Sequence, residues 1–147
     1  MRKILYISVA LMLTSTIVFS YENTIVVSND RGGLVLDYFD KVKKISKDDT
    51  RVELKNDCSS MCTYYLTLPK PLVCAHKNTV FMFHPLYKRD IKGNRVANYN
   101  LTTAVFKNYP NWVNDFITKQ GGMQNRSVKH YIKMHYNYFK NHMNICK

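Results

Sequence analysis

Cys58-Ser59-Ser60-Met61-Cys62-Thr63 is the stretch around which this chain is organised. An alternating segment, Arg51 to Asn56, precedes it and predicts a strand, while the residues from Ser60 to Leu66 favour a helix. A serine at such a strand-to-helix junction is a candidate nucleophile. The alternative is that Ser60 only caps the helix, which is a common role for serine.

A glycine pair upstream of this stretch is the second feature of interest. Thr24 to Ser28 is rich in β-branched residues and predicts a strand. Gly32-Gly33 follows it, and the apolar residues between Val35 and Ile45 then recur at helical spacing. A glycine loop that opens a helix presents free backbone N–H groups, which are good donors to a developing negative charge. A simple strand-to-helix turn is the alternative.

A histidine downstream is the third feature. Thr79 to Phe83 predicts a short strand with His84 at its end and Pro85 as the stop. In parallel sheets, active residues lie at the carboxyl ends of strands. Ser60 and His84 are both expected at that kind of position, although His84 could equally be a structural histidine at a strand end.

The rest of the chain completes an α/β pattern. Leu72 to Ala75 predicts another strand, and residues 86–98 are polar and predict an irregular surface loop. Three helical runs then follow, at Thr102 to Asn108, Pro110 to Lys119 and Gln124 to Met143. Strands that alternate with helices predict a largely parallel sheet, here with C-terminal helices.

The N-terminus predicts export. Arg2 and Lys3 precede an apolar run from Ile4 to Phe19, with a cleavage point near Ser20. Residues 1–20 are therefore expected to be a signal peptide, and residues 21–147 a single domain in the periplasm or outside the cell. An uncleaved membrane anchor is disfavoured because the run is short for a spanning helix.

The charge of the chain restricts its partners. The formal net charge is +12, and loss of Arg2 and Lys3 with the signal peptide leaves +10. Such a charge favours anionic surfaces, including those of the cell envelope. No nucleic-acid partner is expected, because an exported protein meets little of it and no aromatic stacking platform accompanies the basic residues.

The chain has four cysteines, which are disulfide candidates in an exported protein: Cys58, Cys62, Cys74 and Cys146. Three pairings are open, because spacing alone does not choose among them. No metal site and no cofactor are predicted, since no pair of cysteine and histidine residues forms a recognised ligand module.

These motifs together resemble the Clp-protease/crotonase-like superfamily, and in particular small exported bacterial proteins related to the Clp proteolytic subunit. The matching residues span nearly the whole mature chain: Gly32-Gly33, Cys58 to Thr63, Cys74, Phe83-His84, Tyr109-Pro110, Trp112-Val113, Gly121-Gly122-Met123 and Cys146. The resemblance implies a spiral of β-α units with the serine at a strand-to-helix turn.

The resemblance also implies catalytic roles. Ser60 would be the nucleophile and His84 its general base, and the backbone N–H groups of Gly33 and Met61 would bind the oxyanion. The family uses an aspartate beyond the histidine, and Asp115 is the candidate for that place. A Ser-His dyad, a histidine oriented by an asparagine or a carbonyl, and an inactive site remain as alternatives.

The function expected from these residues is serine-dependent hydrolysis of an acyl bond in a peptide or another acyl substrate. The competing class is an inactive exported binding or envelope protein that keeps the fold and uses its basic surface. The oligomeric state is left open.

Overall fold

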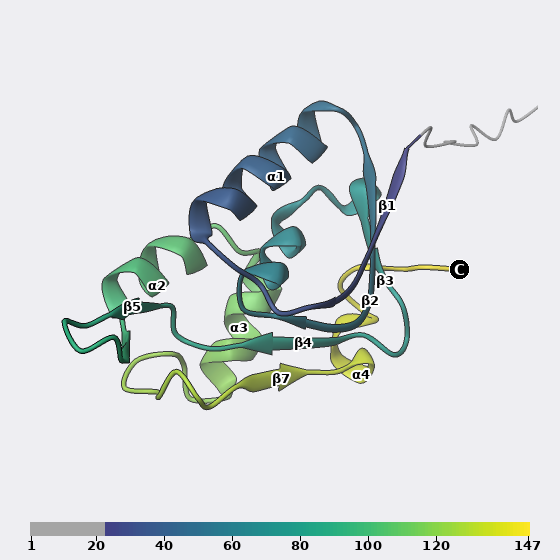
Figure 1. Ribbon diagram of the computed structural model, residues 1–147. Helices are drawn as coiled ribbons and strands as arrows, with labels where there is room; N and C mark the ends of the chain where they lie inside the picture. The colour runs from purple at the N-terminus through teal and green to yellow at the C-terminus, as the bar shows by residue number, and fades with distance from the viewer. Residues whose placement is uncertain (1–22) are drawn as a thin grey trace, which may run out of the picture.

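The computed structural model describes residues 23–147 (Figure 1). The predicted signal peptide, residues 1–20, lies outside these residues. Within the described chain, no helix is long and apolar enough to cross a membrane.

One strand, β2 (Arg51–Ser59), is the centre of the sheet. On one side it runs parallel to β1 (Thr24–Asp30). Along its other edge, β2 pairs with two strands, both in parallel. β3 (Val73–Ala75) pairs with the first residues of β2, and β4 (Val80–Phe83) pairs with the last ones. Val52 and Leu54 of β2 are completely buried, so the face of the sheet to which they point is covered.

Two short strands from the C-terminal part complete this sheet. β7 (Ile132–Met134) pairs antiparallel with β4, and β8 (Asn144–Ile145) pairs parallel with β3. The architecture is therefore α/β, with a mixed sheet of mostly parallel strands. This confirms the predicted class and the mostly parallel sheet.

A short 3-10 helix lies between the first helix and this sheet (Figure 1). α1 (Val35–Lys47) packs on the short 3-10 helix η1 (Ser60–Thr67), where the rings of Tyr38 and Tyr65 meet edge to face with centroids 5.7 Å apart. The remaining helical segments are η2 (Lys70–Leu72), α2 (Tyr99–Phe106), α3 (Asn111–Lys119) and α4 (Tyr136–Phe139).

Two sequence predictions were wrong. The run from Gln124 to Met143 is not one helix but contains turns, β7 and the single-turn α4. The polar segment 86–98 holds a hairpin of β5 (Tyr87–Arg89) and β6 (Arg95–Ala97), which projects away from the sheet (Figure 1).

The four cysteines form two disulfides, one at each end of β2. Cys58 is bonded to Cys62, and Cys74 to Cys146. This resolves the pairing that the sequence left open.

Candidate active site

Ser60 occupies a strained turn between β2 and η1. Its φ is +55°, in the left-handed region that few residues other than glycine adopt. Among residues 23–147, every other non-glycine residue with positive φ is an asparagine or aspartate, whose side chains tolerate this region: Asn29, Asp49, Asn56 and Asn125. Strain of this kind persists only where the surroundings impose it, and it gathers at functional sites.

The capping alternative for Ser60 does not apply. Ser59 is the N-cap of η1, and no side chain caps this helix. The Ser60 side chain is half-buried, and its Oγ has no hydrogen-bond partner within residues 23–147. The hydroxyl is therefore available to a base or a substrate.

Gly32 packs directly against the Ser60 turn. A Cβ at Gly32 would lie 2.7 Å from the nitrogen of Met61 and 2.8 Å from the Cβ of Ser60. Its φ is +79°, which also favours glycine. Only a glycine thus lets the first loop approach the serine so closely, and this brings the glycine pair and the serine into one site.

Asp30 fixes the conformation of the glycine loop. Its Oδ1 accepts a hydrogen bond of 2.8 Å from the backbone N–H of Gly32, and both its carboxylate oxygens lie 2.7 Å from the Tyr38 hydroxyl. Burial and this carboxylate raise the pKa of Tyr38, so its hydroxyl stays a donor. The N–H of Gly32 therefore already donates to Asp30 and is not available to a ligand.

Two further backbone N–H groups, those of Gly33 and Met61, belong to this loop and turn. The N–H of Gly33 has no acceptor within residues 23–147. Met61 is the second residue of η1, and the first N–H groups of a helix have no intrahelical acceptor. The family resemblance assigns the oxyanion to the N–H groups of these two residues, and that role stays a prediction.

The far side of the turn is held by two hydroxyl groups. Thr63 Oγ1 donates to the backbone carbonyl of Ser60 at 2.7 Å and lies 2.7 Å from the Tyr109 hydroxyl. A threonine hydroxyl has a single proton, so Tyr109 is the donor in the second bond. Burial raises the pKa of Tyr109, which keeps that proton in place.

The Cys58–Cys62 disulfide bridges the same turn. Its two residues flank Ser60 at two positions on either side, and both are buried. The turn is thus fixed by a covalent bond as well as by hydrogen bonds and close packing.

His84 lies at the end of β4 and is 5% exposed. Its Nδ1 is 2.8 Å from the carbonyl oxygen of Pro85. A carbonyl only accepts, so Nδ1 carries the hydrogen and Nε2 is the unprotonated, basic nitrogen. Burial lowers the pKa of His84, with a further contribution from the positive charge of Arg95, and outweighs the opposing effect of the Pro85 hydrogen bond. The imidazole is therefore neutral at pH 7.

Aromatic rings enclose His84. The Tyr131 ring meets it edge-on at 4.9 Å between centroids, and the Tyr87 ring is nearly parallel to it at 6.4 Å. The Arg95 guanidinium in turn covers Tyr87 at 4.7 Å from the ring centroid. The hairpin β5–β6 therefore forms part of the wall around the histidine.

The structure brings together some of the predicted site residues but not all of them. The turn brings together Ser60, Met61, the glycine pair and the Cys58–Cys62 bridge. Within residues 23–147, however, no hydrogen bond joins Ser60 to His84. Asp115 is exposed on α3, and the Nδ1 hydrogen of His84 goes to Pro85 instead. The carbonyl-oriented histidine is thus the arrangement found.

Sequence analysis assigned no role in supporting the site to three residues that have one: Asp30, Thr63 and Tyr109. Asp30 carried a signal, since an aspartate two residues before a glycine is suited to accept its backbone N–H. The bond between Thr63 and Tyr109 joins residues 46 positions apart and leaves no local pattern.

Only one cluster in residues 23–147 has the spacing of metal ligands. It consists of Glu53, Cys74 and Cys146, whose ligand atoms lie within 4.8 Å of one another. Both sulfur atoms belong to a disulfide, so neither is a thiolate that could bind a cation. The site at Ser60 contains no such cluster.

Comparison of the chain with protein-family models and with curated proteins found no match. The resemblance described above therefore stays a prediction from the residues themselves.

Proposed function

We propose that the protein is an exported serine hydrolase that cleaves acyl bonds in peptides. The observation that carries this proposal is the left-handed Ser60 between a strand and a helix, with its hydroxyl unbonded and Gly32 packed beneath it. Nucleophilic serines of hydrolases with an α/β fold sit on strained strand-to-helix turns of this kind.

In the proposed reaction, Ser60 Oγ attacks the acyl carbon and His84 Nε2 takes its proton. A neutral imidazole with a fixed tautomer suits this role, and the Pro85 carbonyl fixes that tautomer. The attack requires Ser60 and His84 to approach within hydrogen-bond distance when the substrate binds. Catalytic hydrogen bonds are often long in ligand-free enzymes and shorten in the substrate complex.

The N–H groups of Gly33 and Met61 would stabilise the oxyanion of the tetrahedral intermediate. Donors of this kind are worth roughly 3 kcal/mol each in well-studied serine proteases. The 58–62 disulfide and the Gly32 contact support this role because they hold both donors in place before substrate arrives.

The proposal extends to the fold and the location. We infer a Clp/crotonase-like spiral of β-α units, supported by the parallel pairing of β1 with β2 and of β2 with both β3 and β4. The two disulfides are compatible with an extracellular protein, which supports export.

A specific observation favours a second function. His84 has no carboxylate partner and no hydrogen bond to Ser60 within residues 23–147, which fits a binding protein that has lost turnover. Such a protein would use its basic surface on an anionic envelope polymer.

A fluorophosphonate probe separates the two functions, because it needs an activated serine but no knowledge of the substrate. We expect the mature protein to be labelled, Ser60→Ala to lose the label, and Ser46→Ala, on the exposed face of α1, to keep it. Absence of labelling in folded wild-type protein would favour the binding protein.

A further inference from the structure

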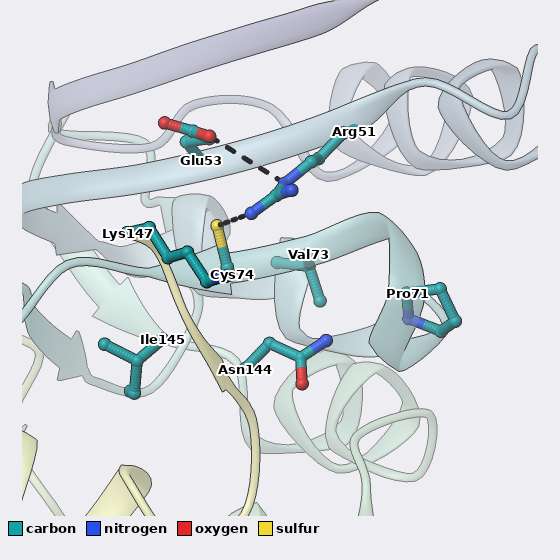
Figure 2. A pocket seen from close by; sticks show the side chains of 8 residues that line it. All are labelled: Arg51, Glu53, Pro71, Val73, Cys74, Asn144, Ile145 and Lys147. Atoms are coloured by element: carbon teal, nitrogen blue, oxygen red, sulfur yellow. Dashed lines mark hydrogen bonds and ion pairs between the residues drawn. The ribbon is translucent and has the colours of Figure 1, made fainter. Parts of the chain in front are cut away.

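A second polar site lies at the opposite end of β2 from Ser60. It is a cavity of about 570 Å³ next to the Cys74–Cys146 disulfide, and its charged lining residues are Arg51, Glu53 and Lys147 (Figure 2). Its volume falls within the range of small-molecule and peptide sites.

Arg51 touches the disulfide itself. One guanidinium nitrogen, Nη2, donates to Cys74 Sγ at 3.2 Å, while Nε lies 3.8 Å from the Glu53 carboxylate. Figure 2 shows Arg51 between these two residues, joined to both by dashed lines. A fixed positive charge at one sulfur favours that sulfur as a thiolate.

The two halves of this disulfide differ in their surroundings. Both residues are buried, but Cys146 is 8% exposed against 1% for Cys74. Cys74 lines the cavity together with Arg51, whereas Cys146 is not one of its lining residues. An incoming thiolate would therefore approach Cys146 from outside the cavity, and the electron pair would pass to the sulfur that Arg51 stabilises.

We propose that Cys74–Cys146 is a thiol–disulfide exchange site, at which a thiolate from a partner dithiol attacks Cys146 and Cys74 leaves as a thiolate held by Arg51. The partner is a protein with a pair of reactive cysteines, which is the chemical class that reduces or rearranges disulfides outside the cytoplasm.

The exchange balances in two steps. The first forms a mixed disulfide between the partner and Cys146 and breaks the bond to Cys74. The second thiol of the partner then attacks its own sulfur in the mixed disulfide and releases Cys146. The dithiol is oxidised to a disulfide, the Cys74–Cys146 pair is reduced, and the proton of each attacking thiol ends on a cysteine of the protein or in solvent.

The consequence is local. β8 is held to β3 by the disulfide, by its parallel pairing and by the Cys146 N–H bond to the Ala75 carbonyl at 3.1 Å. Asn144 Nδ2 also donates to the Lys70 carbonyl at 2.8 Å, and Ile145 packs against the core. Reduction would remove the covalent one of these links, and so loosen the last residues of the chain while Ser60, at the other end of β2, stays in place.

Two other charged residues near the disulfide have opposite effects on the stability of a thiolate. Lys147 lines the cavity and attracts a thiolate, whereas Glu53 opposes one and lies 3.4 Å from His76 Nε2. The 58–62 disulfide differs, because both its residues are at most 1% exposed and, within residues 23–147, no charged side chain donates a hydrogen bond to either sulfur.

Trapping with glutathione on the folded mature protein tests the direction of attack. After acid quenching, alkylation and peptide mapping, we expect the glutathione adduct on Cys146 and the alkyl group on Cys74. An adduct on Cys74, or reduction of 58–62 first, would overturn the proposal.

Variants test the role of Arg51 through the exchange rate. With dithiothreitol, we expect Arg51→Gln to slow reduction of the 74–146 bond about tenfold, because a fixed charge beside the leaving sulfur is lost. Arg51→Lys should restore most of the rate. Lys55→Gln, an exposed position on the same strand, is the matched control and should not change it. Equal rates for Arg51→Gln and Lys55→Gln, in variants shown to fold by circular dichroism, would contradict the assignment.

Discussion

The two ends of β2 each carry a disulfide, but the two bonds serve different purposes. At the Ser60 end, the bond spans four positions and lies among backbone donors, hydroxyl groups and a close glycine contact. At the Arg51 end, the bond spans 72 positions and lies among charged groups beside a cavity. The first fixes the geometry of one turn, while the second ties the end of the chain to the sheet. Equal numbers of cysteines thus give a rigid site at one end and an anchored terminus at the other.

Removal of the disulfides should change the free energy of unfolding the most, and by different amounts at the two ends of β2. Replacing Cys74 and Cys146 by alanine is expected to lower the free energy of unfolding by about 4.5 kcal/mol, against about 2 kcal/mol for Cys58 and Cys62, because the longer bond closes the longer loop. Urea unfolding of both double variants measures this difference. Equal losses would mean that loop closure does not govern these bonds.

The next largest loss of stability is expected from a substitution in the glycine pair, which tests the Ser60 end alone. Gly32→Ala should destabilise the protein by about 3 kcal/mol, because a Cβ there meets backbone atoms of the turn at a left-handed position. Gly33→Ala is the matched control, since its Cβ would be 3.6 Å from the nearest atom, a Tyr38 carbon. Urea unfolding should show little change for it. A similar cost for both variants would argue against the close contact between Gly32 and the turn.

A smaller effect concerns the hydroxyl groups behind Ser60. Tyr109→Phe should cost about 1 kcal/mol, because buried Thr63 Oγ1 loses its donor. Tyr64→Phe removes a hydroxyl that has no hydrogen bond within residues 23–147 and should be nearly neutral. Thermal unfolding compares the two, and the prediction fails if Tyr64→Phe is the more costly.

The smallest effect is a shift in the titration of His84. Its pKa should lie below the usual 6.5 because burial disfavours the imidazolium, and Arg95→Gln should raise it by removing a positive charge. Because the folded pKa is the lower one, the contribution of His84 to stability is complete above pH 6.5 and is lost as pH falls below it. Proton NMR of the His84 ring measures the pKa, with Lys88→Gln on the same hairpin as control. An unchanged pKa in Arg95→Gln would exclude the electrostatic influence of Arg95.

The sequence predicted the first half of the fold well, because its signals are local. The strand before Gly32, the helix from Val35 and the strand entering Cys58 all formed, and their bounds differ by a few residues. Two strands end close to turn-forming residues, β1 near Asn29 to Gly33 and β4 near the proline after His84. These residue types act within a few positions, so pattern analysis finds them.

The helical runs predicted at Thr102 to Asn108 and Pro110 to Lys119 also formed, as α2 and α3, but the segment after Gly122 could not be predicted in this way. Ile132 and Met134 are buried and Lys133 between them is exposed, as in a strand, but three residues are too few to separate that pattern from a helical one. Their conformation depends on pairing with β4, which lies about fifty positions earlier. The orientation of the His84 ring could not be predicted either. Its hydrogen-bond acceptor is a backbone carbonyl, and every residue has one.

The rate at which a fluorophosphonate reacts with Ser60, measured against pH, tests most directly whether Ser60 and His84 form one site. Peptide mapping should place the adduct on Ser60, and the rate should fall as pH drops through the lowered pKa of His84, because only the neutral imidazole accepts the proton. His84→Gln should lose both the fast reaction and its pH dependence. A Ser60 adduct that forms at the same rate in His84→Gln, or a folded protein that forms none, would contradict the site described here.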